Sequence, residues 1–187
     1  MQKSKQEKYI SVDIEASGPI PGEVSMLSLG ACVVGDKSKT FYVELKPLNN
    51  NFVSRALRAS GLSMKELKIN GAEPAEAMAN FEKWILEASK DSRPVFVAFN
   101  ATFDWIFCHW YFIKFLSRDP FGISGLDIKA YYMGMQNCAW NETIKKKISL
   151  NFPSKTKHTH NALKDAIEQA ELFEEILKFN QNKTQKS

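Results

Sequence analysis

Two acidic residues stand close together at the end of the first apolar segment, YISVDIEA at 9–16. Asp13 and Glu15 are separated by one residue, so on a β-strand their side chains face the same way, roughly 7 Å apart along the backbone. Two carboxylates on one face repel each other unless a cation lies between them. The pair indicates a site for a divalent cation, although a solvent-exposed strand face would show the same spacing.

A third acid, Asp104, lies in NATFD at 100–104, directly after the apolar run PVFVAF at 94–99. Such a run is typical of a strand that is buried on both faces. Asp104 would then stand in the first turn of the next helix. Ligands of open sheets gather beyond the carboxyl ends of strands, where this acid falls. The helix dipole alone would also favour an acid there.

The third group is HNALKD at 160–165. Asn161 is a typical N-cap residue, which places His160 just outside a helix and Asp165 near its first turn. On a continuous helix a five-residue separation would put the two side chains on different sides. Because His160 precedes the helix, both side chains can face one site. Taken alone, a histidine at this position is usually only a loop residue.

The segments DIEASG, NATFD and HNALKD, in this order, resemble the three motifs of the DEDDh (DnaQ-like) 3′–5′ exonuclease superfamily. The step from His160 to Asp165 matches the DEDDh branch, whereas the tyrosine branch would have Tyr where Asn161 stands. The resemblance covers about 9–175. It implies an α/β fold of the ribonuclease H-like type, a five-stranded mixed β-sheet flanked by α-helices.

The resemblance also implies a role for each acid, as ligands of two Mg²⁺ or Mn²⁺ ions. Asp13 would bridge both metals, Glu15 and Asp165 would complete one, and Asp104 would hold the other through water. Such hard ions prefer carboxylate oxygens, and two of them can hold the attacking and leaving oxygens of a phosphodiester. His160 would be the general base, since histidine side chains exchange protons near neutral pH.

By the same resemblance, three residues after the first motif would meet the terminal nucleotide: Ala16, Ser17 and Gly18. Met26 or Leu27 would wedge against the terminal bases, and Asn100 would touch the scissile nucleotide or its phosphate. The implied enzyme is a metal-dependent 3′–5′ exonuclease. It would bind 3′ ends of single-stranded nucleic acid and release nucleoside 5′-monophosphates.

The sequence leaves the choice between DNA and RNA open, because it shows no reader of the 2′-hydroxyl. An oligoribonuclease-like hydrolase of very short RNA is one alternative. A catalytically inactive nucleic-acid-binding domain on the same fold is another, and the five intact signature residues count against it.

The elements that must position these residues follow from hydrophobic periodicity and turn signals. Strands are predicted at 9–16, 25–34, 39–46, 94–99 and 125–128. Helices are predicted at 74–89, 103–116 and 161–179, with shorter helical pieces around 52–68 and a helical turn at 131–133. The segment 135–158 is expected to be irregular. Early hairpin-like strands followed by alternating helices and strands are typical of an α/β domain with a mixed sheet.

The 187 residues fit one domain, expected at 9–179, between a flexible basic tail at 1–8 and a flexible tail at 180–187. We see neither a signal peptide nor an apolar run long enough for a membrane-spanning helix. The three cysteines form no CxxC pair, which favours a reducing cytoplasm over a zinc site or a disulfide framework.

The charge is unevenly distributed. The net charge is +4, yet residues 143–164 alone hold six lysines and no acid. The first five of these lysines, Lys145–Lys147, Lys155 and Lys157, precede His160, so we expect them to border the site and meet phosphates, although a solvated loop would have the same composition. The aromatic helix at 103–116 is apolar on all sides, which indicates a second covered face and a possible homodimer contact.

Overall fold

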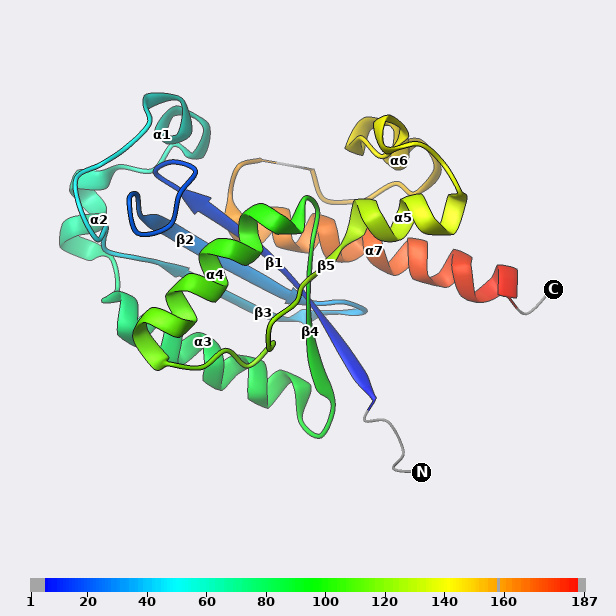
Figure 1. Ribbon diagram of the computed structural model, residues 1–187, viewed down its shortest axis with the longest axis horizontal. Coiled ribbons are helices and arrows are strands. Elements are labelled where there is room, and N and C mark those ends of the chain that lie inside the picture. The colour runs from blue at the N-terminus through cyan, green and yellow to red at the C-terminus, as the bar shows by residue number, and fades with distance from the viewer. Residues whose placement is uncertain (1–5, 158, 185–187) are drawn as a thin grey trace.

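The computed structural model of the chain describes residues 6–157 and 159–184. A five-stranded mixed sheet lies at its centre, in the order β3-β2-β1-β4-β5 (Figure 1). The strands are β1 (Glu7–Ala16), β2 (Met26–Val33), β3 (Asp36–Glu44), β4 (Arg93–Ala98) and β5 (Leu126–Asp127). The first three strands pair antiparallel, and β4 and β5 add in parallel. The expected fold class is confirmed.

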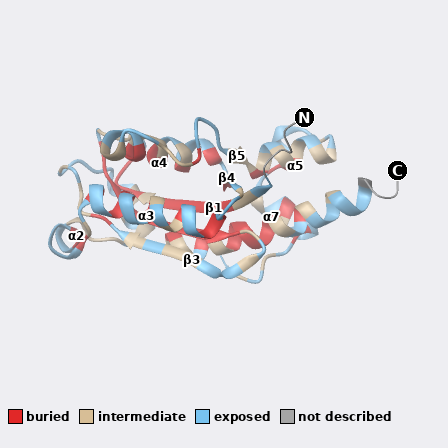
Figure 2. Cartoon of the chain, turned by 90° about the horizontal axis from the view of Figure 1, so that it is seen from below, coloured by how far each residue is buried: buried red, intermediate tan, exposed pale blue. Residues whose placement is uncertain are grey.

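Helices cover both faces of the sheet. They are α1 (Ser54–Ser60), α2 (Met64–Asn70), α3 (Pro74–Ser89), α4 (Ala101–Leu116), α5 (Ile128–Gln136), α6 (Lys145–Asn151) and α7 (Ala162–Thr184). A short 3-10 helix, Trp140–Glu142, lies between α5 and α6. The long helix α7 packs on β1, β2 and β3, while α3 and α4 pack together on the other face (Figures 1 and 2). No helix in the described part of the chain is long and apolar enough to cross a membrane.

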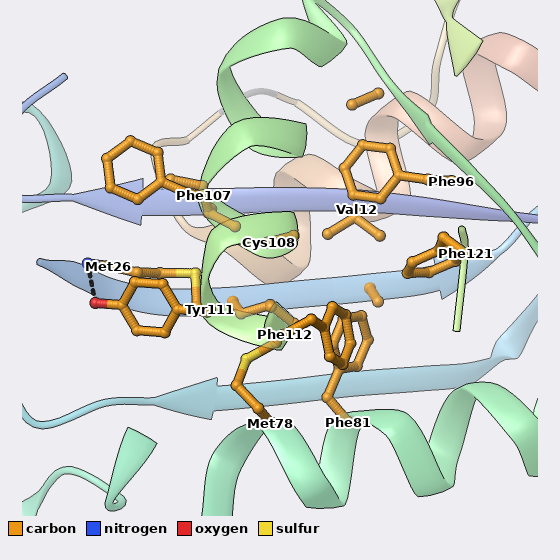
Figure 3. Close-up of a cluster of buried hydrophobic side chains, with 14 of the residues drawn as sticks. Val12, Met26, Met78, Phe81, Phe96, Phe107, Cys108, Tyr111, Phe112 and Phe121 are labelled. Atoms are coloured by element: carbon orange, nitrogen blue, oxygen red, sulfur yellow. Dashed lines mark hydrogen bonds between the residues drawn. The ribbon is translucent and has the colours of Figure 1, made fainter. Parts of the chain in front are cut away.

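Strand β1 is buried on both faces because it is the central strand (Figure 2). Ile10, Val12 and Ile14 belong to the core beneath α3 and α4, where Phe81, Phe96 and Phe112 also lie (Figure 3). Side chains alternate along a strand, so the intervening residues face α7. This alternation directs Asp13 and Glu15 toward one helix, as their spacing predicts.

Several boundaries differ from the sequence-based prediction. β1 begins at Glu7, because Glu7 and Lys8 pair with β4. α7 continues past Phe179 to Thr184, and the Asn180 amide donates to the Tyr131 hydroxyl. The first strand and the last helix therefore extend beyond 9–179. Residues 1–5 and 185–187 of the two expected tails lie outside the described residues.

The prediction of an irregular segment at 135–158 is wrong. This segment contains the end of α5, the 3-10 helix and α6. Ile148 and Phe152 are buried against α5 and α7, and these two apolar anchors fix α6 within a lysine-rich stretch. Two further elements are longer than predicted: α4 begins at Ala101, and the helical turn at 131–133 is part of α5.

Candidate active site

The five signature residues converge at the carboxyl end of β1. Asp13, Glu15, Asp104 and His160 line one cavity of about 270 Å³. Ligand atoms of Glu15, His160 and Asp165 lie within 4.8 Å of one another. Residues that are up to 152 positions apart in the sequence (13 to 165) thus share one site, supplied by β1, α4, α7 and the segment before α7.

Asp104 is held against β1 by a main-chain contact. Its Oδ1 accepts a hydrogen bond of 3.0 Å from the backbone N–H of Ile14. Asp104 lies in the first turn of α4, and its side chain is 5% exposed. The contact holds the first turn of α4 against β1 at Ile14, the residue between Asp13 and Glu15.

Asp165 reaches the site because α7 lies unusually close to the sheet. Gly30 on β2 pairs with Asp13 in the antiparallel register. A Cβ atom at Gly30 would lie 2.3 Å from the backbone of Ala162 and Leu163, so only glycine fits there. The first turn of α7 is capped as predicted, since the Asn161 Oδ1 accepts from the Lys164 N–H at 3.1 Å.

A residue without a sequence signal supports Asp13. The Gln169 amide nitrogen donates to the Asp13 Oδ1 at 2.6 Å, and the Gln169 Oε1 accepts from the Phe99 N–H at 2.8 Å. Gln169 lies one turn beyond Asp165 on α7 and is 2% exposed. Because Gln169 is four residues after Asp165, the sequence could have placed both on the same face of α7, but it could not have identified the two partners of Gln169.

The segment before His160 is held at several points by carboxylates of α7. The Glu171 Oε2 accepts from the backbone N–H groups of Lys155 (2.8 Å) and Thr156 (2.9 Å). The Asp165 Oδ1 accepts from the Thr159 N–H at 2.8 Å. His160 itself is exposed and has φ +55°, a conformation that histidine adopts more readily than most residues. These contacts hold the backbone on the N-terminal side of His160 in place, while the His160 side chain is exposed.

Glu171→Gln tests this anchoring. Loss of its charge weakens the bonds to the segment and to Lys37 (2.7 Å). We expect kcat to fall about tenfold with little change in KM, since a displaced catalytic group costs rate more than affinity. Amide exchange at Lys155 and Thr156 should accelerate. Glu174→Gln, on the same helix, is the matched control; equal effects of the two substitutions would contradict this role.

The acids repel one another in the cavity. Burial raises the pKa of Asp13 well above its usual range, and Asp104, Asp165 and Glu15 raise it further. Burial also raises the pKa of Glu15 to about 8 and that of Asp104 to about 7. Lys145 counteracts part of this effect at Asp13 and Asp104.

This donor set fits divalent cations. Buried carboxylate oxygens that repel one another are the ligands that Mg²⁺ and Mn²⁺ prefer, and a cation would remove the repulsion that raises their pKa values. Within the described residues, the group Glu15, His160 and Asp165 has a spacing that can hold one ion.

The raised pKa values predict how pH affects stability. Carboxylates that hold their protons more tightly in the folded state stabilise it less as pH rises from the unfolded pKa through the folded one. For Glu15 this window runs from about 4.5 to about 8. In EDTA, we expect Tm to fall between pH 5 and pH 8. The rise in Tm on adding Mn²⁺ should grow over the same range.

Calorimetry at several pH values, with EDTA or Mn²⁺, measures both trends. Glu15→Gln should flatten the EDTA curve. A Tm in EDTA that is constant or rising from pH 5 to pH 8 would refute the electrostatic account of the site.

The residues expected at the terminal nucleotide differ in accessibility. Ala16 and Gly18 line a second cavity, of about 300 Å³, which meets the first at Glu15 and Phe103. Ser17 is fully buried, and its hydroxyl donates to the Asn51 carbonyl oxygen and accepts from the Ser25 N–H. The Ser17 side chain therefore holds the loop together instead of facing the cavity.

The expected wedge residue is not accessible. Met26 and Leu27 are both fully buried, and the Met26 N–H donates to the Tyr111 hydroxyl at 2.8 Å in the core (Figure 3). The expectation for Met26 is wrong because β2 is covered on both faces. Instead, an unpredicted set of side chains lines the second cavity: Val53, Arg55, Ala56, Ala59 and Phe103.

Asn100 lines the first cavity in a left-handed conformation with φ +63°. Its Oδ1 accepts from Lys129 Nζ at 2.9 Å. Among the lysines of 143–164, Lys145 donates to Glu168 at 2.5 Å and lowers the pKa of Asp13 and of Asp104. Lys147 pairs with Glu142 instead.

Comparisons with known proteins show which family the chain belongs to. The family model of the 3′-5′ exoribonuclease Rv2179c-like domain matches residues 8–177. The 3′-5′ DNA exonuclease Cap18 of Escherichia coli is 44% identical over 182 residues, which cover 97% of each chain.

Solved structures share the fold at low identity. The nuclease domain of 3′hExo, a DEDDh family member solved with rAMP, has a TM-score of 0.76 at 13% identity and covers 96% of this chain and 95% of its own. E. coli Exonuclease I with a dT13 oligonucleotide has a TM-score of 0.73 at 14% identity, covering 97% of this chain and 43% of its own. The matched range spans the positions of all five proposed site residues, and the chain belongs to the family of 3′-5′ exoribonuclease Rv2179c-like domains.

Proposed function

We propose that this 3′–5′ exonuclease removes nucleoside 5′-monophosphates one at a time from the 3′ end of single-stranded DNA. The observation that carries the proposal is the convergence of four carboxylates and His160 on one cavity. The choice of DNA rests on the relative that shares 44% identity over nearly its whole length and is named a DNA exonuclease.

Asp13, Glu15, Asp104 and Asp165 would hold two Mg²⁺ or Mn²⁺ ions. When bound, the ions neutralise the phosphate and favour ionisation of the attacking water. His160 accepts the proton of that water on an imidazole nitrogen, and its position outside α7 leaves the ring accessible to the substrate. Gln169 keeps Asp13 in place through its hydrogen bond.

The second cavity fits the terminal nucleobase. It is apolar apart from Glu15 and Arg55, and Phe103 stands at its junction with the carboxylates. Aromatic and aliphatic walls accept any base, because every base has a π-face. A terminal base here would place its 5′-phosphate toward the carboxylates, as exonuclease chemistry requires.

We place the enzyme in a reducing cytoplasm, since its three cysteines are unpaired. The exposed side of α4 carries Ile106 and Ile113, and the possible homodimer contact there stays a prediction.

Incubation of 5′-labelled single-stranded DNA and RNA with the protein tests the function. Mg²⁺ or Mn²⁺ should give a one-nucleotide ladder from the 3′ end of DNA, which EDTA abolishes. A ladder on RNA alone would instead favour an exoribonuclease, the activity that the family's description names, and a ladder only on RNA of a few nucleotides would favour the oligoribonuclease-like alternative. If neither polymer is cleaved in a metal-dependent way, the proposed activity is refuted, and the alternative of a catalytically inactive nucleic-acid-binding domain is left.

A further inference from the structure

An exposed tryptophan lies on the opposite side of the carboxylates from the second cavity, the base cavity, which is proposed to hold the terminal nucleobase. The base cavity is lined by residues of α1, whereas Trp140 lies between α5 and α6; Figure 1 shows α1 and the α5–α6 region on opposite sides of the start of α4. The Trp140 side chain is 53% exposed. Its backbone is firmly held, because its carbonyl oxygen accepts from the Oγ1 of Thr143 at 2.7 Å, and Thr143 is fully buried. An exposed ring thus stands on a fixed turn.

Lys129 connects this ring to the active site. Its Nζ lies 4.1 Å from the centre of the Trp140 ring and 2.9 Å from the Oδ1 of Asn100, which lines the carboxylate cavity. Ring, ammonium group and amide therefore form a continuous row of contacts. The cation–π contact orients the ring and leaves its other face for a second planar group.

The charge on this side suits a polyanion. The Nζ atoms of Lys129 and Lys145 lie 5.9 and 5.2 Å from the centre of the Phe99 ring, and Lys145 is also paired with Glu168. Phe99 also lines the carboxylate cavity. A strand that leaves the acidic centre in this direction meets two ammonium groups and then an aromatic face, the combination that single-stranded nucleic-acid sites use.

We propose that Lys129 and Trp140 form a subsite for the nucleotide that precedes the terminal one, with Trp140 stacked on its base and Lys129 against its phosphate. The proposal rests on the proposed exonuclease function and names the next substrate contact. Together the base cavity, the carboxylates and this subsite would grip two successive nucleotides across the scissile bond.

A double-mutant cycle tests the stacking. The two changes are Trp140→Ala and an abasic residue second from the 3′ end of a dT oligonucleotide, with release of the first nucleotide measured in a single turnover. Each change alone should lower kcat/KM about tenfold, the cost of one base–aromatic stack. The two together should cost no more than either alone. Trp140→Phe should restore most of the loss.

Leu150→Ala is the matched control, since Leu150 lies on α6 nearby and is 80% exposed. Leu150→Ala should leave kcat/KM unchanged on both the intact and the abasic oligonucleotide. Additive losses from Trp140→Ala and the abasic residue would overturn the stacking while leaving the exonuclease function intact. Failure of the wild type to degrade any oligonucleotide would instead refute the function.

Lys129→Gln tests the phosphate contact. Removing one contact to a single strand should reduce the slope of log KM against log salt concentration by about 0.7. Lys114→Gln, on the far end of α4, should leave the slope unchanged. An unchanged slope for Lys129→Gln would overturn the assignment of its phosphate contact.

Discussion

Replacing His160 with alanine is expected to lower kcat on single-stranded DNA by about 10²- to 10⁴-fold, the range of a general base. Three of the four carboxylates have main-chain or amide anchors of their own: the Asp104 Oδ1 accepts from the Ile14 N–H, the Asp13 Oδ1 from the Gln169 amide, and the Asp165 Oδ1 from the Thr159 N–H. Mn²⁺ and DNA affinity should therefore change little.

The same variant separates two roles of His160. Its ring nitrogen lies within 4.8 Å of ligand atoms of Glu15 and Asp165, so the geometry would also allow it to bind a metal. If His160 is only the general base, the His160→Ala enzyme keeps its Mn²⁺ affinity and is slow, and added imidazole accelerates it. If His160 also binds a metal ion, the substitution reduces the heat of Mn²⁺ binding in calorimetry.

His109→Ala is the matched control for this prediction. His109 lies on α4, and its Nδ1 is 2.8 Å from Asp119 on the side away from the site. Its loss should leave kcat unchanged. Full activity of His160→Ala would refute the assignment of the general base.

The five candidate residues could be named from the sequence because three short motifs, in one order, resemble those of the DEDDh exonucleases. Alternation along β1 and the cap at Asn161 fix the directions of Asp13, Glu15 and Asp165 locally, and both are confirmed. The order of strands and helices follows equally from local periodicity.

The supporting contacts could not be predicted, because they join distant segments. Gln169 and Asp13 are 156 residues apart, and no local pattern distinguishes Gln169 from a solvent-exposed glutamine. The need for Gly30 appears only once α7 lies on β2. The wedge expected at Met26 failed for the same reason, since its position in β2 is covered from both sides.

Asp13→Asn is expected to abolish exonuclease activity and the heat of Mn²⁺ binding, as are Asp13→Ala and Asp165→Ala. The asparagine variant is the most informative of the three. Its side chain keeps the shape of Asp13, and its Oδ1 can still accept the hydrogen bond from Gln169. What it removes is one buried negative charge that faces Asp104, Asp165 and Glu15.

The metal-free variant should therefore be more stable than the wild type. Relief of repulsion is expected to raise Tm at pH 8 in EDTA by about 3 °C or more, since each kcal/mol moves the Tm of a chain of this size by about 2–4 °C. The difference should shrink toward pH 5, where the raised pKa values of Glu15 and Asp104 keep both groups protonated in the folded wild type. Asp36→Asn, on the exposed β2–β3 hairpin, is the control and should change neither activity nor Mn²⁺ binding.

This pairing of lost activity with gained stability distinguishes a metal centre from a structural cluster. Acids that merely held the fold together would lose stability on substitution. Acids kept for a cation destabilise the empty site and are stabilised only when it is loaded. A lower Tm for Asp13→Asn in EDTA, or Mn²⁺ binding equal to that of the wild type, would show that Asp13 contributes to folding and not to a cation site.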